Sequence, residues 1–333
     1  MKIATVNKYN KNNIQLTFKE VPMPQPKKNQ ILIKSLTAGV NPVDNMISRG
    51  QLKLILPYKL PLISGNEVVG KVIKTGSDVN EFQQGDRIFA RLPLNHIGAF
   101  AEYIAIDSNA VAKVPDYLSD EEAAAIPLTG LTAMQAFDLM NIQKGKRIFI
   151  SGGTGSFGAI AIPLAKYFGL YVITNGNGNN SKQVLNLGAD EFIDYKKENY
   201  LNVISNKVDY IIDTLGGEET KKQFKILKSN GKLVSLKNMP NYEFAKQMHL
   251  PLSKRILFGL AGAKLDRLAA KNNQKYYFLF VKENGQQLKK IATIYKEKQM
   301  HPQIDQVFPF EQINNALSKI DQGHSKGKTI IKF

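Results

Sequence analysis

In the N-terminal third of the chain, short hydrophobic runs alternate with clusters of glycine, proline, asparagine and aspartate. Four of these runs are rich in β-branched residues: ILIKSLTAGV, EVVGKVIKTG, DRIFARL and AEYIAI. Runs of this length and composition between turn residues are typical of β-strands. The N-terminal part is therefore expected to form a β-rich module.

The hydrophobic spacing changes at Ser119, at the start of SDEEAAAIPLTGLTAMQAFDLM. This segment begins with a serine and acidic residues, continues with apolar residues at helical spacing, and so predicts a helix. From residue 147 to 283, short β-branched segments alternate with amphipathic ones, which predicts a parallel sheet with crossover helices. The expected strands are RIFIS, YVIT, EFI, VDYIID, KLVSL and YYFLFV. Between Met239 and Asn273 we expect helices and a loop.

After Glu283 a helix, QQLKKIATIYKEK, precedes the strand IDQVFPF, a short helix and the terminal strand KTIIKF. These segments are expected to rejoin the first module. The predicted fold is α/β, with a Rossmann-type doubly wound parallel sheet inserted in a β-rich domain. The expected domain boundaries are 1–123 plus 284–333 for the outer domain and 124–283 for the insert.

A glycine-rich sequence directly follows RIFIS and opens an amphipathic helix, the context in which G-x-G-x-x-G predicts a dinucleotide site. In such sites the glycines allow a tight turn, close approach of a pyrophosphate and helix–strand packing, and the helix N-terminus attracts phosphate. The alternative is a loop that only turns the chain. The residues expected to contact the cofactor here are Gly153, Thr154, Gly155, Ser156, Phe157 and Gly158.

The residues that select between NAD and NADP lie about 20 residues further on. NAD enzymes have an acidic residue there that binds the ribose 2′-hydroxyl. This chain has no acidic residue there before Asp190. Hydrogen-bond donors replace it, and they favour a 2′-phosphate, so the sequence predicts NADPH over NADH. An ordinary polar loop is the alternative. The candidate donors are Asn175, Asn179, Asn180, Ser181 and Lys182.

Cysteine is absent from the 333 residues, which excludes disulfides, thiol nucleophiles, iron–sulfur clusters and zinc sites with thiolate ligands. The four histidines are far apart in the sequence, and none stands at metal-ligand spacing. We therefore expect no catalytic metal. The histidines are His96, His249, His301 and His324.

The formal net charge of +17 leaves a nucleic-acid or acidic-membrane partner open, although lysine and asparagine are spread evenly along the chain. That distribution favours a general compositional bias over a binding surface. No run approaches the ~18 consecutive apolar residues of a membrane-spanning helix. The opening residues lack the apolar core of a secretory signal, so a cytoplasmic location is expected.

Six segments in order along the chain resemble the zinc-free quinone oxidoreductase branch of the medium-chain dehydrogenase/reductase superfamily. The segments are GVNPVD, IPLTGLTA, SGGTGSFG, LGADEFIDY, IDTLGG and GHSKGK. The resemblance implies a GroES-like catalytic domain that carries a Rossmann insert, with substrate and nicotinamide meeting in the cleft between them. It also implies a homodimer.

The resemblance assigns further residues to the cofactor. Asn41 and Thr129 would lie beside the nicotinamide end, and the loop Thr214–Leu215 would pass close to it. Tyr195 and Asn180 would approach the adenosine 2′-phosphate. Lys326 stands where relatives often carry an arginine near the cofactor.

One departure from the wider superfamily bears on the chemistry. Zinc-dependent members use cysteine and a GHE-type histidine as metal ligands, whereas this chain reads GNE at Gly65 to Glu67. Without a Lewis acid to polarise the carbonyl group, simple alcohol oxidation loses the main stabilisation of the charge on the substrate oxygen. Quinones and α,β-unsaturated carbonyls need less help because they delocalise the incoming charge. The expected reaction is hydride transfer from NADPH to such small-molecule acceptors.

Candidates for direct roles in the reaction are Asn41, at the nicotinamide end, and Tyr58, as a proton donor. Tyr58 lies in LPYKLP and has the alternative of packing under a proline-rich loop. Asp44 could touch substrate or cap a turn. Phe278 and Phe280 could line the acceptor pocket or the cofactor site, or be buried in sheet or dimer contacts.

A second class of function also remains open from the sequence. The chain could bind NADPH with little turnover and serve as a structural or RNA-binding partner. Strong, salt-dependent RNA binding would favour that alternative, because neutralising phosphates releases counterions.

Overall fold

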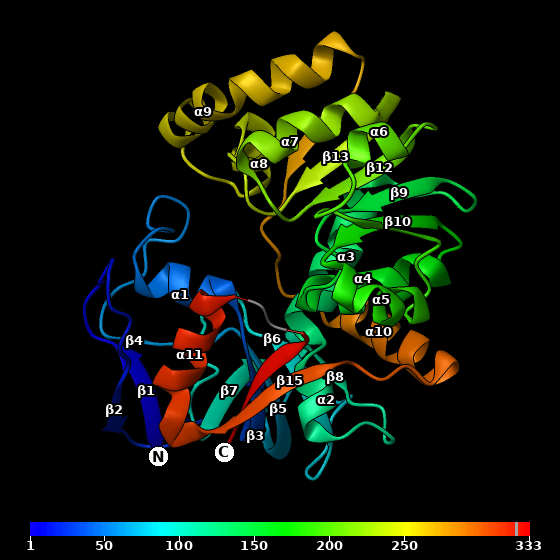
Figure 1. The fold of residues 1–333 in the computed structure, drawn as a ribbon. Coiled ribbons are helices and arrows are strands. Elements are labelled where there is room, and N and C mark those ends of the chain that lie inside the picture. The colour runs from blue at the N-terminus through cyan, green and yellow to red at the C-terminus, as the bar shows by residue number, and fades with distance from the viewer. Residues whose placement is uncertain (324–325) are drawn as a thin grey trace. The chain divides into compact units, whose positions relative to one another are not determined.

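The structure is a computed structural model that describes residues 1–323 and 326–333; His324 and Ser325 lie outside it. The chain divides into two compact units (Figure 1). One, the β-rich unit, comprises Met1–Leu131 and Lys282–Phe333. The other, the inserted unit, comprises Thr132–Val281.

The β-rich unit contains two sheets. The larger has the strand order β15-β16-β3-β5-β6-β8, with β7 also paired to β3. Its strands are β3 (Gln30–Val40), β5 (Glu67–Thr75), β6 (Arg87–Arg91), β7 (Tyr103–Asp107), β8 (Val111–Lys113), β15 (Ile304–Pro309) and β16 (Lys328–Lys332). The smaller sheet is formed by β1 (Lys2–Val6), β2 (Thr17–Glu20) and β4 (Leu62–Ile63).

The four N-terminal strands expected from hydrophobic runs are present as β3, β5, β6 and β7. Strand β3 is buried over most of its length because it pairs with β5, β7 and β16. Strand β16 runs antiparallel to β3, so the C-terminal segment completes the sheet that the N-terminal segment begins. This part of the fold prediction is confirmed.

Helices cover this unit. They are α1 (Pro42–Ser48), α2 (Asp120–Ala124), α10 (Gly285–Lys298) and α11 (Ile313–Gln322). The helical segment expected after Ser119 is divided in two, because α2 ends before Pro127 and α3 (Pro127–Met140) begins there. A residue that precedes proline is disfavoured in the helical conformation, which explains the break. Helix α3 continues into the inserted unit.

The inserted unit contains a parallel sheet with the order β11-β10-β9-β12-β13-β14. Counted from β9, this is the order 3-2-1-4-5-6 of a dinucleotide-binding fold, in which the strand order reverses between β9 and β12. The predicted doubly wound sheet is therefore confirmed. Its strands are β9 (Arg147–Ile150), β10 (Tyr171–Gly176), β11 (Glu191–Asp194), β12 (Val208–Asp213), β13 (Leu227–Ser235) and β14 (Lys275–Phe278).

The connecting helices are α4 (Ser156–Tyr167), α5 (Ser181–Asn186), α6 (Tyr200–Val203), α7 (Gly217–Gln223), α8 (Tyr242–Gln247) and α9 (Leu252–Lys271). Helices α8 and α9, yellow in Figure 1, contact each other and β14, and they confirm the helices expected between Met239 and Asn273. The last strand is shorter than predicted and ends at Phe278. Its neighbour β13 ends at Ser235, so the residues beyond Leu279 have no strand to pair with.

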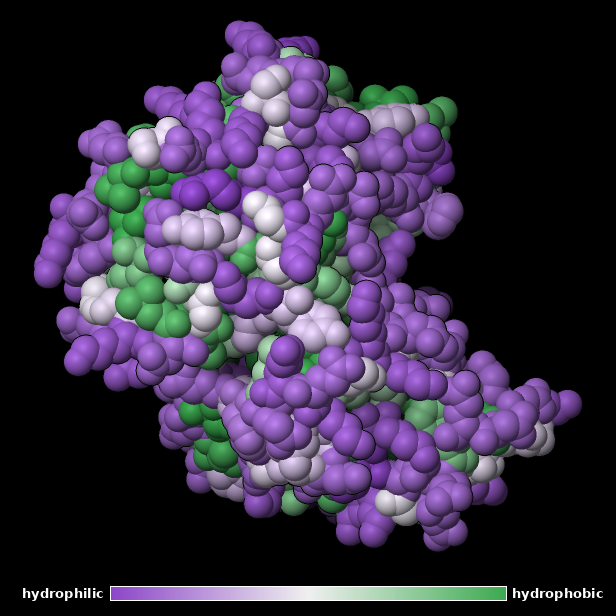
Figure 2. Space-filling view, turned by 90° about the vertical axis from the view of Figure 1, so that its right-hand side faces the viewer, coloured by the Kyte–Doolittle hydropathy of each residue, from purple (hydrophilic) through white to green (hydrophobic). Residues whose placement is uncertain are grey.

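The face drawn in Figure 2 is mostly hydrophilic, with hydrophobic residues in separate small areas. This agrees with lysines spread along the chain rather than gathered in one segment. Among the residues that the structure describes, no helix is both long enough and apolar enough to cross a bilayer.

Candidate functional site

The glycine-rich loop of the inserted unit joins β9 to α4, at the edge where the sheet's strand order reverses. A Cβ atom on Gly153 would lie 2.0 Å from the Thr174 hydroxyl oxygen, and one on Gly158 would lie 2.1 Å from the Gly153 carbonyl oxygen. Side chains are therefore excluded at both positions by packing. The loop is held against β10 by the Gly153 N–H, which donates to the Asn175 carbonyl at 2.9 Å.

Gly155 differs from these two glycines. A Cβ there would find only the Gly152 carbonyl oxygen within 4 Å, at 3.4 Å. The missing side chain thus leaves room directly in front of α4, whose first N–H groups have no acceptor inside the helix. Space and N–H donors at a helix N-terminus are what a pyrophosphate requires. The residues present therefore fit a dinucleotide.

A buried aspartate, Asp213, organises the neighbouring loop at the end of β12. Its Oδ1 accepts the backbone N–H groups of Leu215 and Gly216, each at 3.0 Å, and its Oδ2 accepts the Ser235 hydroxyl at 2.8 Å. Thr220 and Gln223 also donate to this carboxylate. Asp213 was not among the candidate residues from the sequence, although it stands inside the IDTLGG segment.

The two candidate residues of this loop differ in exposure. The Thr214 hydroxyl donates to the Ser151 carbonyl at 2.7 Å, so Thr214 is tied to the start of the glycine-rich loop. Leu215 is 42% exposed. The structure brings the predicted residues Thr214 and Leu215 beside Gly152, since a Cβ on Gly152 would lie 2.9 Å from Thr214 Oγ1 and 3.9 Å from Leu215 Cδ2.

Asn175 is buried, and its Oδ1 accepts the Gly152 N–H at 2.9 Å. Its side chain therefore supports the glycine-rich loop directly. This leaves the Nδ2 group as the part of the side chain that could serve the predicted role of donor to a phosphate. Asn180, which precedes α5, is half-buried.

The strands β10 and β11 end next to each other, which places Tyr195 beside the Gly176 carbonyl, to which its N–H donates at 3.2 Å. The Tyr195 side chain is 58% exposed. Asp194 approaches the same loop, since a Cβ on Gly178 would lie 2.1 Å from its Oδ2. The sequence reasoning looked for an acid only within the segment after β10, and it missed this carboxylate from the neighbouring strand.

The remaining candidates of the inserted unit and of the C-terminal segment are less closely grouped. The Phe278 ring packs edge-on against Phe244, with centroids 4.9 Å apart, which agrees with the packing alternative for this residue. Phe280 lies beyond the end of β14 and is half-buried. Lys326 is exposed and directly follows the undescribed residues His324 and Ser325.

A row of buried polar side chains crosses four neighbouring segments of the β-rich unit. Strand registers set Gly39 opposite Glu67 and Glu67 opposite Arg91. Lys328 begins β16, and its ammonium lies 2.6 Å from both Glu67 Oε1 and the side-chain oxygen of Asn41. Buried charges at the end of a sheet are uncommon unless they are paired.

Thr129 joins this row from the first turn of α3. Its hydroxyl oxygen lies 3.3 Å from the Lys328 ammonium. Asn41 Nδ2 donates to Glu67 Oε1 at 2.7 Å. The structure thus brings together Asn41 and Thr129, the two residues assigned to the nicotinamide end, and it adds Glu67 and Lys328, which the sequence reasoning did not select.

Asp44 caps the start of α1, one of the two roles considered for it. Its Oδ2 accepts the Asn41 N–H at 2.7 Å, and its Oδ1 accepts the Asn66 side-chain amide at 2.7 Å. Complete burial raises the pKa of Asp44 to about 7, although its hydrogen bonds and Lys328 act in the opposite direction. This carboxyl group can therefore change its protonation state near neutral pH.

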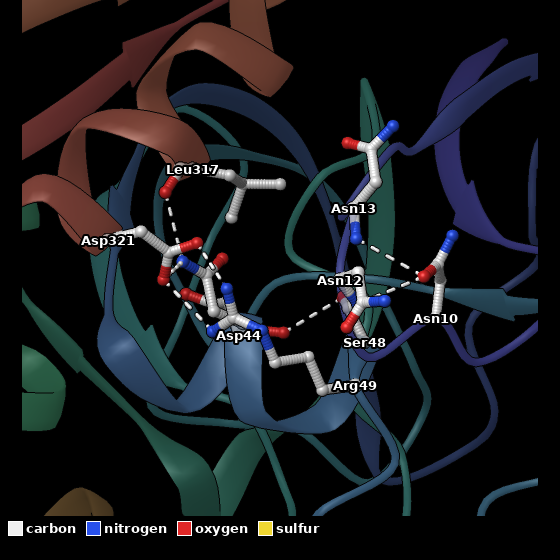
Figure 3. A network of polar contacts seen from close by, with 9 residues as sticks. Asn10, Asn12, Asn13, Asp44, Ser48, Arg49, Leu317 and Asp321 are labelled. Atoms are coloured by element: carbon white, nitrogen blue, oxygen red, sulfur yellow. Dashed lines mark hydrogen bonds and ion pairs between the residues drawn. The ribbon is translucent and has the colours of Figure 1, made fainter.

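The helix that carries Asp44 is fixed to α11 by one side chain of its last turn and by that of Arg49, which follows the helix (Figure 3). Asn45 donates to the Leu317 carbonyl at 2.9 Å and to Asp321 at 2.7 Å. Arg49 forms an ion pair with the same Asp321. These contacts hold α1, and with it Asp44 and the capping residue Asn41, against α11.

Tyr58 lies near the end of β6, and its hydroxyl donates to the Leu94 carbonyl at 2.6 Å. Burial raises the pKa of Tyr58 to about 12, an effect that Arg91 opposes. Arg91 is 1% exposed, and its guanidinium lies 3.8 Å from the Glu283 carboxylate. The Arg91 Nε has no hydrogen-bond partner among the described residues. Because burial raises its pKa, Tyr58 stays protonated at neutral pH, as a proton donor must.

The raised pKa of Asp44 predicts a pH dependence of stability. The folded protein binds this proton more tightly than the unfolded chain, whose carboxyl has the ordinary pKa of 3.8. The contribution of Asp44 to stability is therefore greatest below pH 3.8 and is lost as the pH rises toward 7. Between these values the free energy of unfolding should fall by at most about 1.4 kcal/mol per pH unit.

Asp44→Asn cannot titrate and is the matched variant. Denaturant titrations at pH 4.5 and 7.5 should give unfolding free energies whose pH dependence differs between the variant and the wild type. The wild type should lose stability relative to the variant as the pH rises. Parallel pH profiles would show that Asp44 does not titrate in this range.

Two family models match the chain: an alcohol dehydrogenase GroES-like domain over residues 27–116, and a zinc-binding dehydrogenase model over residues 187–331. The quinone-oxidoreductase homolog of Spinacia oleracea chloroplasts is 33% identical, over 94% of this chain and 92% of that protein. This chain belongs to the quinone oxidoreductase branch of the medium-chain dehydrogenase/reductase superfamily. The resemblance inferred from six short segments is thereby confirmed.

Two further comparisons agree with membership of this branch. The 2-methylene-furan-3-one reductase of Solanum lycopersicum is 29% identical over 99% of this chain and 79% of that protein. The solved quinone oxidoreductase of Coxiella burnetii has a TM-score of 0.85, with 28% identity over 100% of this chain and 99% of the other.

Among the described residues, no group of three His, Cys, Asp or Glu side chains could hold a metal ion.

Proposed function

We propose that this protein is an NADPH-dependent oxidoreductase that reduces quinones or α,β-unsaturated carbonyl compounds. The observation that carries the proposal is the open space at Gly155 in front of α4, within a sheet of dinucleotide-binding order. Relatives named as quinone and furanone reductases support the acceptor class.

When bound, the dinucleotide would supply a hydride from its nicotinamide ring. The residues that would hold it in the inserted unit are the glycine-rich loop and Thr214–Leu215. In the β-rich unit, Asn41 and Thr129 are proposed to contact its nicotinamide end. Their side chains are held by buried ionic and hydrogen-bond partners, so they can orient a ligand with little loss of conformational freedom.

The preference for NADPH over NADH is a further part of the proposal. Asn180 and Tyr195 lie where β10 and β11 end, and the exposed Lys182 and Lys196 flank them. Asp194 is the opposing feature, because its carboxylate would repel a 2′-phosphate. The ratio of kcat/KM for NADPH to kcat/KM for NADH measures whether the attraction by these donors and lysines exceeds the repulsion by Asp194. We expect this ratio to favour NADPH.

Steady-state oxidation of NADPH, with a panel of quinones, 2-alkenals and simple aldehydes, tests the proposed function. We expect turnover of quinones or 2-alkenals, little turnover of simple aldehydes and no inhibition by EDTA. If NADPH binds while no acceptor is reduced, the alternative of a binding protein is favoured. Titrations with RNA at two salt concentrations would then test that alternative.

Tyr58→Phe tests the proposed proton donor. The variant loses the hydroxyl bond to the Leu94 carbonyl and any proton transfer from the phenol. General acid catalysis contributes about 100-fold or more, so kcat should fall by that order if Tyr58 donates the proton. A kcat within threefold of wild type, with an unchanged KM for NADPH, would limit Tyr58 to packing beneath the proline-rich loop.

A homodimer and a cytoplasmic location complete the proposal. The spinach relative is described as chloroplastic, so the location of this protein needs its own measurement. Light scattering of the purified protein and fractionation of the source cells would test these two points.

A further inference from the structure

Lys328 is surrounded by three oxygen atoms in the buried part of the β-rich unit. Its ammonium lies 2.6 Å from Glu67 Oε1, 2.6 Å from Asn41 Oδ1 and 3.3 Å from Thr129 Oγ1. An ammonium group has three N–H donors and no acceptor, so these three oxygens satisfy it completely. The lysine and glutamate side chains are 5% and 0% exposed.

Glu67 is just as fully engaged. Its Oε1 accepts from both Lys328 and Asn41 Nδ2, and its Oε2 accepts the Leu128 backbone N–H at 2.7 Å. Leu128 lies in the first turn of α3, where backbone N–H groups lack partners and a negative charge is favoured by the helix dipole. The carboxylate therefore joins β5 to the helix that carries Thr129.

The two ends of the Asn41 amide face opposite partners. Its NH₂ group faces a carboxylate and its oxygen faces an ammonium, so the amide cannot rotate by 180° without facing like groups. Either charge alone would bias this orientation, and the pair fixes it. The same ammonium also fixes the oxygen position of the Thr129 hydroxyl.

A gain in stability alone does not explain why Glu67 and Lys328 form a buried ion pair. Removing two charges from water costs several kcal/mol, and replacing a buried ion pair by neutral side chains is often neutral or stabilising. The pair also lies at the segments GNE and GHSKGK rather than in the hydrophobic cores of the unit.

We propose that Glu67 and Lys328 are positioning residues, which orient Asn41 and Thr129 for the nicotinamide end of the cofactor. The inference rests on the proposed function, because the contact of Asn41 and Thr129 with the cofactor is part of it. Neither charged side chain needs to touch the cofactor itself, since both act through the amide and hydroxyl that they hold.

The test compares Lys328→Met, Glu67→Gln and the double variant. Each single variant leaves a buried charge without its partner and should melt at a lower temperature than wild type. The double variant has no unpaired charge and should recover much of the lost thermal stability. Cofactor binding should not recover with it, and the dissociation constant for NADPH should remain raised by about tenfold or more.

Two controls separate positioning from a general effect of charge. Lys332→Met removes a lysine from the same strand whose ion pair with Glu121 is exposed, and it should leave NADPH binding unchanged. Lys328→Arg keeps the positive charge and should bind NADPH more tightly than Lys328→Met. Equal weakening by Lys332→Met would overturn the proposal.

The decisive comparison repeats Lys328→Met in a background that lacks both contacts, Asn41→Ala/Thr129→Val. If Lys328 acts through Asn41 and Thr129, Lys328→Met should add little to the effect of that background, both in NADPH affinity and in kcat/KM. Fully additive effects, or a double Glu67→Gln/Lys328→Met variant with wild-type affinity and kcat, would contradict the inference. The affinities are measured by NADPH fluorescence without an acceptor, so absence of acceptor reduction would count against the proposed function only.

Discussion

Gly155→Val should weaken NADPH binding strongly while the protein remains folded. The Gly155 backbone has φ −88° and ψ 175°, a conformation open to any residue, and a Cβ there meets only the Gly152 carbonyl oxygen at 3.4 Å. The valine side chain would instead fill the space in front of α4. Blocking the phosphate site should raise the NADPH dissociation constant by about 100-fold, which corresponds to about 2.7 kcal/mol.

Fluorescence titration with NADPH measures this effect, and thermal melting gives the control, since the melting temperature should change by only a few degrees. Gly158→Val is the contrasting variant, because its Cβ would lie 2.1 Å from the Gly153 carbonyl oxygen and should disrupt folding. Wild-type NADPH affinity in Gly155→Val would place the phosphates elsewhere and refute the assignment of this loop.

Asp213→Ala should cause a large loss of stability. The variant removes a buried carboxylate that accepts from two backbone N–H groups, two hydroxyls and one amide. These donors would remain buried with fewer partners than they need. The expected loss is about 3 kcal/mol or more in the free energy of unfolding, and weaker cofactor binding through the loop at Thr214–Leu215.

Asp209→Ala is the matched control, because Asp209 lies on the same strand but remains partly exposed, with ion pairs to Lys228 and Lys146. It should cost about 1 kcal/mol, as expected for surface ion pairs and one backbone hydrogen bond. Urea titrations of both variants give the comparison. A smaller loss for Asp213→Ala than for Asp209→Ala would contradict the role assigned to the buried carboxylate.

The fold was largely predictable because each of its signals is local. Strands of the inserted sheet are short β-branched runs, and the glycine-rich loop is recognisable between its first strand and helix. The end of β14 at Phe278 was not predictable in the same way. The run of apolar residues continues to Val281, whereas the strand ends where its partner β13 ends.

The buried charges were missed for a related reason. Lys328, Glu67 and Arg91 lie on strands that are far apart in the sequence, and they meet only through the register of the sheet. A one-residue shift of register would turn any of these side chains to the other face. One local signal was present, since Glu67 directly precedes Val68 and Val69, and Lys328 directly precedes Thr329, Ile330 and Ile331.

Transfer of deuterium from NADPH labelled at C4 to a 2-alkenal is the most direct test of the proposed function. Mass spectrometry of the product should find one deuterium on the β-carbon from one of the two stereospecifically labelled cofactors, and none from the other. Gly155→Val should form much less of this labelled product at the same concentration of NADPH. Oxidation of NADPH without deuterium in the product, or no oxidation with any conjugated acceptor, would contradict the account.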